Sequence, residues 1–225
     1  KYGSDTARLF ILFAAPPDRD LEWSETGVEG SYKFLNRVWR LVLEIIENAD
    51  ETQKAEVSTA DDRQLYYELN KTVKRVTECL AAGRFSFNTS ISSIMELVNE
   101  MYRYKETEAP NYALMREAAV KLVLVLSPFV PHICEEMWQK LGFEHSLYFE
   151  KWPEYDESAL VLDTVEIVVQ LNGKVKMKAD VARGLSREEL ADIMLADERV
   201  KELTAGKNVV KVIAVPGKLV NIVVK

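Results

Sequence analysis

The chain has 225 residues, 48% of them hydrophobic and 29% charged, which is ordinary for a folded globular protein and leaves room for two domains. No apolar run approaches the roughly 20 residues that span a bilayer, and the first residues lack the apolar block of a signal peptide. The net charge of −7 argues against a nucleic-acid binder held by overall charge, and the distant Cys79 and Cys134 make no disulfide framework and fit a reducing cytoplasm.

The first predicted helix runs from Asp5 to Ala15 and ends at Pro16-Pro17, because proline disfavours helical geometry in the residue before it. Lys1-Tyr2-Gly3 carries no helix start signal, which suggests that the chain was cut from a longer protein. A long amphipathic helix follows the acidic loop that begins at Leu21. Its apolar stripe has helical spacing and comprises Val28, Leu35, Val38, Trp39, Val42, Ile45 and Ile46.

The opposite face of this helix carries a line of charge that is basic in its first half and acidic in its second: Lys33, Arg37, Arg40, Glu44 and Glu47. That order opposes the helix macrodipole, and each pair of neighbouring like charges costs about a few tenths of a kcal/mol. Two interpretations follow. The face is either an ordinary solvated surface, or its basic half (Lys33, Arg37 and Arg40, here called the ridge) contacts a phosphate backbone.

Further helices complete a predicted bundle of about five helices with short connections. Thr59 and Asp62 form a weakened capping box at the start of the next helix, and Gly83 ends it. A third helix precedes two more, which begin at Pro110 and at Pro131.

From Phe143 to Asp163 the helical periodicity is lost, which predicts a linker at about 143–162 that wraps the bundle and is held by Tyr148, Phe149 and Trp152. Residues 1–162 hold 18 Lys and Arg against 27 Asp and Glu, a net charge of −9. Residues 163–225 hold 11 against 9, a net charge of +2. We therefore expect two domains, a helical bundle before the linker and a smaller domain after it.

In the second domain the period of the apolar residues changes from about 3.6 to about 2, which indicates strands. Two hairpins are predicted, one turning at Asn172-Gly173 and the other at Pro216-Gly217. A helix between them begins with a capping box formed by Ser186 and Glu189. The expected fold class is multidomain and mainly α, with a helical bundle followed by a small α+β domain that contains two β-hairpins.

The register of the first hairpin has two alternatives. An Asn-Gly pair favours a two-residue loop. Hydrophobic matching instead favours a three-residue loop, Leu171-Asn172-Gly173, because it places Val169 opposite Val175 and Ile167 opposite Met177 on one buried face. We expect the three-residue loop.

The sequence shows no catalytic constellation. His132 and His145 lie neither in an HExxH motif nor near a cysteine at metal-ligand spacing, so we expect no metal site. His132 is interpreted as a partly buried, hydrogen-bonded structural histidine. Glu135 and Glu136 point to different sides of their helix, and the common phosphate-binding and nucleophile motifs are absent from the sequence. We expect no catalytic residue.

Four stretches resemble bacterial leucyl-tRNA synthetases. The run from Lys1 to Val42 is similar to the segment that follows their KMSKS signature, and SPFVPHICEEMW is similar to a helix of their bundle. VVQLNGKVKMK and VPGKLVNIVVK are similar to their C-terminal domain. The resemblance spans essentially the whole chain, although the HIGH and KMSKS signatures, the nucleotide-binding sheet and the editing domain have no counterpart in it.

The resemblance implies that residues 1–155 form a class I anticodon-binding-type domain and that residues 163–225 contact tRNA. It implies a monomeric, cytoplasmic parent enzyme that joins leucine to its tRNA using ATP and Mg²⁺. In that enzyme this chain would dock the body of leucine tRNA beside the missing catalytic core, by the shape of the tRNA rather than its anticodon. The chain alone is expected to be inactive and to bind no cofactor.

The candidate tRNA-binding residues fall into two groups: the ridge of the long helix, where the family helix is also basic at the positions of Lys33 and Arg37, and residues of the second domain. The latter are Lys174, Lys176, Lys178, Lys218 and Asn221. Phosphate contacts from these residues would position a tRNA without specifying bases. Two alternatives remain open: the lysines defend an edge strand against pairing, and Asn221 satisfies a neighbouring backbone group.

Two rival functional classes are compatible with the sequence. One is a non-catalytic helical scaffold that binds a protein partner through its acidic loop, and the other is an enzyme whose site is not evident. A scaffold would bind neither leucine tRNA nor a non-cognate tRNA, and only an enzyme would catalyse leucine-dependent exchange of pyrophosphate into ATP.

Overall fold

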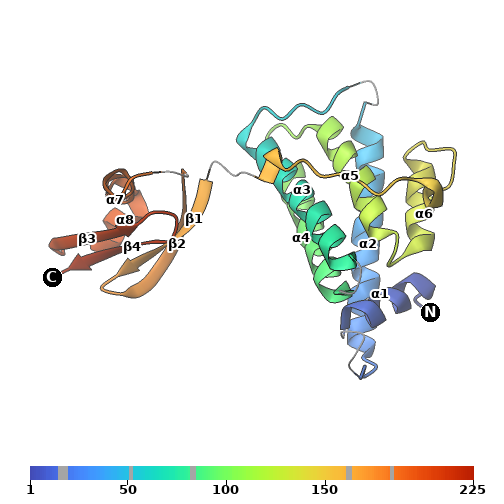
Figure 1. The fold of residues 1–225 in the computed structure, drawn as a ribbon, viewed down its shortest axis with the longest axis horizontal. Helices are drawn as coiled ribbons and strands as arrows, with labels where there is room; N and C mark the ends of the chain where they lie inside the picture. Colours follow the sequence, from blue (N-terminus) through green and yellow to red (C-terminus); the bar gives the residue numbers. More distant parts are fainter. Residues whose placement is uncertain (15–19, 51–52, 82–84, 161–163, 183–184) are drawn as a thin grey trace. The chain divides into compact units, whose positions relative to one another are not determined.

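The computed structural model describes residues 1–14, 20–50, 53–81, 85–160, 164–182 and 185–225. The chain divides into two compact units, Lys1–Leu160 and Val161–Lys225 (Figure 1). Unit 1 is helical, and unit 2 combines a four-stranded sheet with two helices. The expected multidomain, mainly α fold class with a small α+β part is confirmed. Within the described ranges, no helix has the length and apolar character needed to cross a membrane.

The described part of unit 1 contains six α-helices, which agrees with a short first helix followed by a bundle of about five. They are α1 (Ser4–Ala14), α2 (Glu25–Asn48), α3 (Ala60–Leu80), α4 (Phe87–Lys105), α5 (Tyr112–Leu126) and α6 (Pro131–Lys140). Two short 3-10 turns follow, η1 (Leu147–Phe149) and η2 (Ser158–Leu160).

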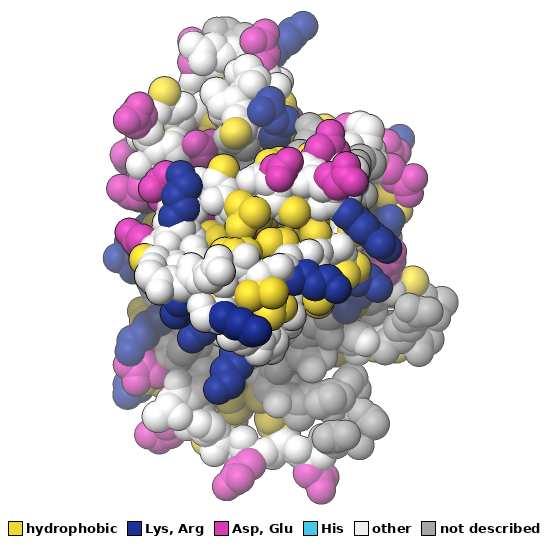
Figure 2. All heavy atoms as spheres, turned by 90° about the vertical axis from the view of Figure 1, so that its left-hand side faces the viewer, with side chains coloured by type: hydrophobic (Ala, Val, Ile, Leu, Met, Phe, Trp, Pro, Cys, Tyr) yellow, Lys and Arg dark blue, Asp and Glu magenta, His cyan; other side chains and the backbone are white. Residues whose placement is uncertain are grey.

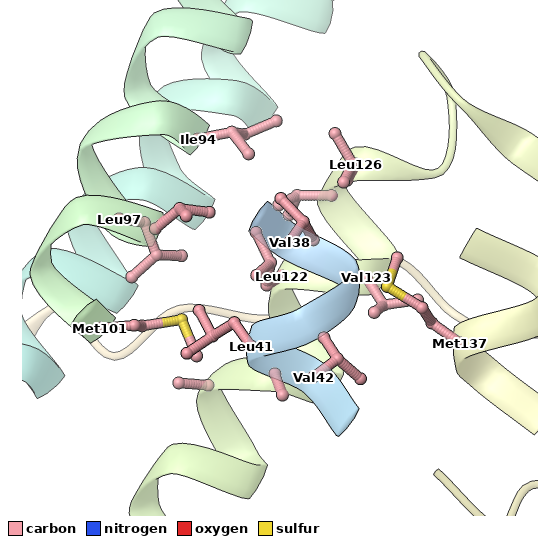
Figure 3. Packing of buried hydrophobic residues seen from close by; sticks show 14 of the residues in the cluster. Val38, Leu41, Val42, Ile94, Leu97, Met101, Leu122, Val123, Leu126 and Met137 are labelled. Atoms are coloured by element: carbon pink, nitrogen blue, oxygen red, sulfur yellow. The ribbon is translucent and has the colours of Figure 1, made fainter. Parts of the chain in front are cut away.

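Helix α2 lies in the middle of the core because its apolar stripe packs on several helices at once (Figure 3). Val38, Leu41 and Val42 are fully buried. Burying each such side chain contributes roughly 1.5–3 kcal/mol, so the stripe fixes the rotation of α2 and turns its charged face outward. The surrounding helices contribute Ile94, Leu97, Met101, Leu122, Val123, Leu126 and Met137.

The predicted helix ends are reproduced in part. The capping box of α3, formed by Thr59 and Asp62, is present. Helix α5 begins at Tyr112 rather than at Pro110, because the side chain of Asn111 accepts a backbone N–H of the first turn. The predicted stops at Gly83 and at Pro16-Pro17 lie outside the described residues.

Helix α1 holds the corner between α5 and α6 from two sides. Arg8 donates to the carbonyl oxygens of Pro128-Phe129 at 3.1 and 3.2 Å. The buried Asp5 accepts the N–H of Ile133 at 2.7 Å, and its other oxygen lies 2.7 Å from Nδ1 of His132. Since α6 has no capping side chain of its own, Asp5 caps it from another helix. The His132 side chain is 73% exposed, so the expectation that it is partly buried is wrong.

The segment after α6 is held mainly by two tryptophans. Trp138 stacks on Phe143 with ring centroids 3.8 Å apart, and the Trp152 indole donates to Oγ1 of Thr77 at 2.7 Å. Trp152 therefore acts as expected, but the Tyr148–Phe149 pair does not, because these side chains are 85% and 78% exposed. Residues up to Leu160 belong to unit 1.

Unit 2 is built on a sheet of order β2-β1-β4-β3, in which both hairpins are antiparallel and β1 runs parallel to β4. The strands are β1 (Thr164–Leu171), β2 (Lys174–Ala182), β3 (Val209–Val215) and β4 (Leu219–Val224). Helix α7 (Arg187–Ala196) begins with the predicted capping box, and α8 (Glu198–Thr204) follows it. Leu190 and Met194 of α7 pack in one cluster with the apolar residues of the sheet.

The three-residue loop predicted for the first hairpin is wrong. The loop is the two-residue Asn172-Gly173, with φ of +49° and +78°, as in a type I′ turn. A β-bulge restores the apolar matching further along, because Lys176 is an extra residue and Val169 then lies opposite Met177 rather than Val175. Ile167 correspondingly lies opposite Ala179. The bulge within β2, and not a longer turn, therefore brings the apolar residues opposite each other.

Candidate nucleic-acid interface

The first residue of the ridge, Lys33, is exposed and pairs within its own helix. Its Nζ lies 2.7 Å from Oε1 of Glu29, one turn earlier. Hydrogen bonding and charge from Glu29 raise the pKa of Lys33 and lower that of Glu29. An exposed pair of this kind contributes little to stability, so Lys33 can exchange Glu29 for a phosphate at small cost.

Arg37 is positioned by α4. Its Nη2 donates to Oδ1 of Asn99 at 3.0 Å, and its guanidinium lies over the Tyr102 ring at 4.8 Å from the centroid. The Tyr102 hydroxyl in turn donates to the carbonyl oxygen of Arg37 at 2.9 Å. A guanidinium has five N–H donors, so this arrangement orients Arg37 and leaves donors for an anion. Asn99 and Tyr102 were not predicted to support Arg37, although their i,i+3 spacing places both on one face of α4.

The rest of the charged line is less uniform than the sequence suggests. Arg40 is exposed, and its Nε donates to the carbonyl oxygen of Asn36 at 3.2 Å. Glu44 is half-buried and forms an ion pair with Lys105 of α4 at 2.8 Å, so it serves helix packing. Glu47 is exposed. The basic half of the line is therefore more available to bind a ligand than the acidic half.

Lys33 and Arg37 also border a groove of about 560 Å³ between α1, α2 and α4. Its lining combines apolar side chains, among them Phe10, Phe34 and Met95, with the polar Ser24, Ser31 and Asn99.

In unit 2 the predicted row of three lysines is divided by the bulge. Lys174 pairs with Leu171 and shares the face of the sheet that carries the core, whereas Lys178 pairs with Val168 on the opposite face. Lys176 is the bulged residue. All three side chains are exposed, and Lys178 contacts Oε1 of Glu166 at 2.8 Å. Because β2 is an edge strand, its lysines and its bulge also protect it against pairing with another strand.

The two remaining candidates differ. Lys218 is exposed after the Pro216-Gly217 turn, where its N–H donates to the carbonyl oxygen of Val215 at 3.0 Å. The side chain of Asn221 accepts the N–H of Gly173 at 3.0 Å and so supports the neighbouring hairpin turn. This contact agrees with the alternative that Asn221 satisfies a neighbouring backbone group.

The surface of unit 2 combines positive charge with aliphatic side chains. On the side that Figure 2 shows, Lys and Arg side chains lie on several sides of a group of apolar ones, and Asp and Glu side chains border its upper side. Among the more exposed apolar residues of this unit are Val175, Val210 and Ile213. Residues 161–225 contain no Phe, Tyr or Trp. Unit 2 can thus contact phosphates and aliphatic surface, but it cannot stack a base on an aromatic ring.

Features of a catalytic centre do not assemble in the described ranges. Those ranges contain no group of three or more His, Cys, Asp or Glu that could hold a metal ion. Glu135 accepts the N–H of Leu147 and the hydroxyl of Ser146, both at 3.1 Å, and is therefore structural. Cys79 and Cys134 are free and buried, and burial raises the pKa of the Cys134 thiol well above its usual value.

Comparison with known families shows which family the chain belongs to. Residues 62–191 match the family described as the anticodon-binding domain of tRNA ligase, which is more than half of the chain. The chain belongs to this family. It is 44% identical to a leucine–tRNA ligase of Symbiobacterium thermophilum, an alignment that covers 100% of this chain and 30% of that protein. The resemblance to leucyl-tRNA synthetases is confirmed.

A solved structure shares the fold of this family member over its full length. The crystal structure of the ternary complex of Agrobacterium radiobacter K84 agnB2 LeuRS-tRNA-LeuAMS matches with a TM-score of 0.74 and 27% identity, covering 100% of this chain and 29% of that chain. The chain thus spans about 30% of the length of the relatives it matches.

Proposed function

We propose that this chain is the tRNA-docking part of a leucine–tRNA ligase. The observation that carries the proposal is the 44% identity to such a ligase across the whole chain. Further support comes from the structural relative, which was solved in a complex with tRNA, and from the family of anticodon-binding domains.

In the parent enzyme, leucine would be joined to its tRNA with ATP and Mg²⁺ at a catalytic core that lies outside this sequence. The chain itself would bind no cofactor and would have the core and leucine tRNA as its partners, within a cytoplasmic monomer. Residues 1–155 would form the bundle and residues 163–225 the second tRNA-contacting domain.

The ridge would hold phosphates. Lys33 is free to change partner, and Arg37 is already oriented by Asn99 and Tyr102, so its ordering cost on binding is low. In unit 2, the exposed Lys174, Lys176, Lys178 and Lys218 would add phosphate contacts. Contacts of this kind recognise shape and not sequence, which fits docking of the body of a tRNA.

The proposal is tested by filter binding of the purified chain to leucine tRNA and to a non-cognate tRNA at two salt concentrations. We expect tighter binding to leucine tRNA and a steep loss of affinity with salt, because phosphate contacts release counterions. A protein-binding scaffold would bind neither RNA.

The ridge is tested by Lys33→Glu, with Glu47→Lys on the same helix as the matched control. Both residues are exposed, whereas Glu44 is unsuitable because its ion pair with Lys105 supports packing. We expect Lys33→Glu to weaken tRNA binding and to reduce the log–log salt slope by about 1. If the double variant that carries both Lys33→Glu and Glu47→Lys regains wild-type affinity, binding follows net charge alone and the ridge is not a docking site.

A further inference from the structure

Tyr148 and Phe149 are the most exposed large hydrophobic side chains of the described residues, at 85% and 78%. Their rings meet edge to face with centroids 5.4 Å apart. Leaving side chains of this size in water forgoes the stabilisation that their burial would give. A pair of adjacent aromatics that remains in water is typical of a contact surface.

The backbone that carries the pair is held by hydrogen bonds on both sides. Glu135 of α6 accepts the hydroxyl of Ser146 and the N–H of Leu147, both at 3.1 Å. The Trp138 indole donates to the carbonyl oxygen of His145 at 3.1 Å, immediately before the turn. Trp152 is tied to α3 immediately after it. The pair is therefore presented from a fixed turn, which lowers the entropy cost of binding.

A groove of about 310 Å³ lies beside the pair. Its apolar lining comes from Leu124, Pro128, Pro131, Leu147 and Trp152, and Tyr148 forms part of its edge. The charged residues of its lining are Glu135, Glu150, whose carboxylate contacts His145, and Lys151.

The surrounding charge selects the occupant. Two of the three charged residues that line the groove, Glu135 and Glu150, are acidic. A nucleic acid is disfavoured at such a surface, whereas a cation is attracted both by the carboxylates and by the faces of aromatic rings. Arginine fits better than lysine because its planar guanidinium stacks on a ring while it pairs with a carboxylate.

We propose that this turn and groove form a docking surface for an arginine-bearing segment of a partner protein. A guanidinium stacks on Tyr148 or Phe149 and pairs with Glu150, and the neighbouring apolar residue of the segment enters the groove. This surface is separate from the ridge and serves protein contact instead of tRNA contact.

The test uses an acetylated tetra-arginine peptide, titrated into the ¹⁵N-labelled full chain and followed by NMR. We expect saturable shifts at residues 145–152, with affinity several-fold weaker for tetra-lysine of equal charge and no shifts for tetra-glutamate. The double variant Tyr148→Ala and Phe149→Ala should lose about tenfold in affinity for tetra-arginine. Tyr32→Ala, which removes another exposed aromatic, should leave it unchanged.

Three outcomes overturn the proposal. If tetra-arginine and tetra-lysine bind with equal affinity, and neither affinity changes in the double variant, the attraction is unspecific and depends on charge. Shifts at the same residues with leucine tRNA, and none with tetra-arginine, assign the surface to RNA. Self-association that is lost in the double variant, detected by sedimentation, assigns it to a second copy of the chain.

Discussion

The hydroxyl of Tyr104 donates to Oδ1 of Asp62 at 2.5 Å and accepts the backbone N–H of Asn111 at 2.9 Å. Tyr104 is fully buried on α4, Asp62 lies in the first turn of α3, and Asn111 caps α5. Oδ2 of the same carboxylate accepts the N–H of Thr59 at 2.8 Å. One hydroxyl therefore joins the starts of two helices to the end of a third.

Replacing Tyr104 with Phe should destabilise unit 1 by about 1–3 kcal/mol, because Asp62 and the Asn111 N–H each lose a buried partner. The ring remains, so packing changes little. All four tryptophans lie in unit 1, and urea unfolding followed by tryptophan fluorescence measures the effect. The exposed Tyr32→Phe serves as the control, and equal stability of the two variants would contradict the prediction.

The Asp62 carboxyl should make unit 1 sensitive to acid. Burial acts to raise its pKa, but hydrogen bonds from Tyr104, Thr59 and Ser58 outweigh burial and hold the pKa at about 2. Because the folded-state pKa is depressed, the stabilisation is complete above pH 4 and is lost as the pH falls toward 2, a change of roughly 2 kcal/mol. Asp62→Asn should be less stable than wild type at pH 6, with the gap narrowing on acidification. A gap that stays constant down to pH 2.5 would argue against this role.

Removing the Asp5 cap should loosen α6. Asp5→Ala should cost about 0.5–2 kcal/mol, because the N–H of Ile133 loses its acceptor at a helix start. His132→Ala should cost less, since that side chain is exposed. Amide exchange at Ile133 and Cys134 reports the cap directly. Unchanged exchange at both amides in the Asp5 variant would refute it.

Asn172→Gly should destabilise unit 2 while keeping its turn. Glycine accepts the positive φ of +49° without strain, so the loss isolates the side chain. That side chain donates to the carbonyl oxygen of Val224 at 3.2 Å and accepts its N–H at 2.9 Å, extending the pairing of the two strands. Faster amide exchange at Val224 is expected, whereas exchange in α7 helix-end residues should change little. Slow exchange at Val224 in the variant would contradict this account.

The features that the sequence predicted well depend on local or periodic signals. The apolar stripe of α2 repeats at helical spacing over many residues, so its burial follows from the pattern. The capping boxes at Thr59 and Ser186 need only four consecutive residues. Lys33 was expected on an exposed helix face, and it is exposed.

The features that the sequence did not predict depend on distant partners. The acceptor for α6 comes from Asp5, and Arg37 is held by two residues of α4. The bulge at Lys176 was missed because a periodic pattern can be restored inside a strand as well as at its turn. The aromatic pair Tyr148–Phe149 was expected to pack because its residues are apolar, but its turn directs both into solvent.

The Asp5 cap also sets an order of events during synthesis on the ribosome. Asp5 and Ile133 lie 128 positions apart, which at ~5–20 residues per second corresponds to roughly 6–25 s of translation. Helix α1 can pack on α2 during this interval, but its bond to α6 cannot form before α6 has emerged. The contact that joins the first helix of unit 1 to its last is therefore among the last to form.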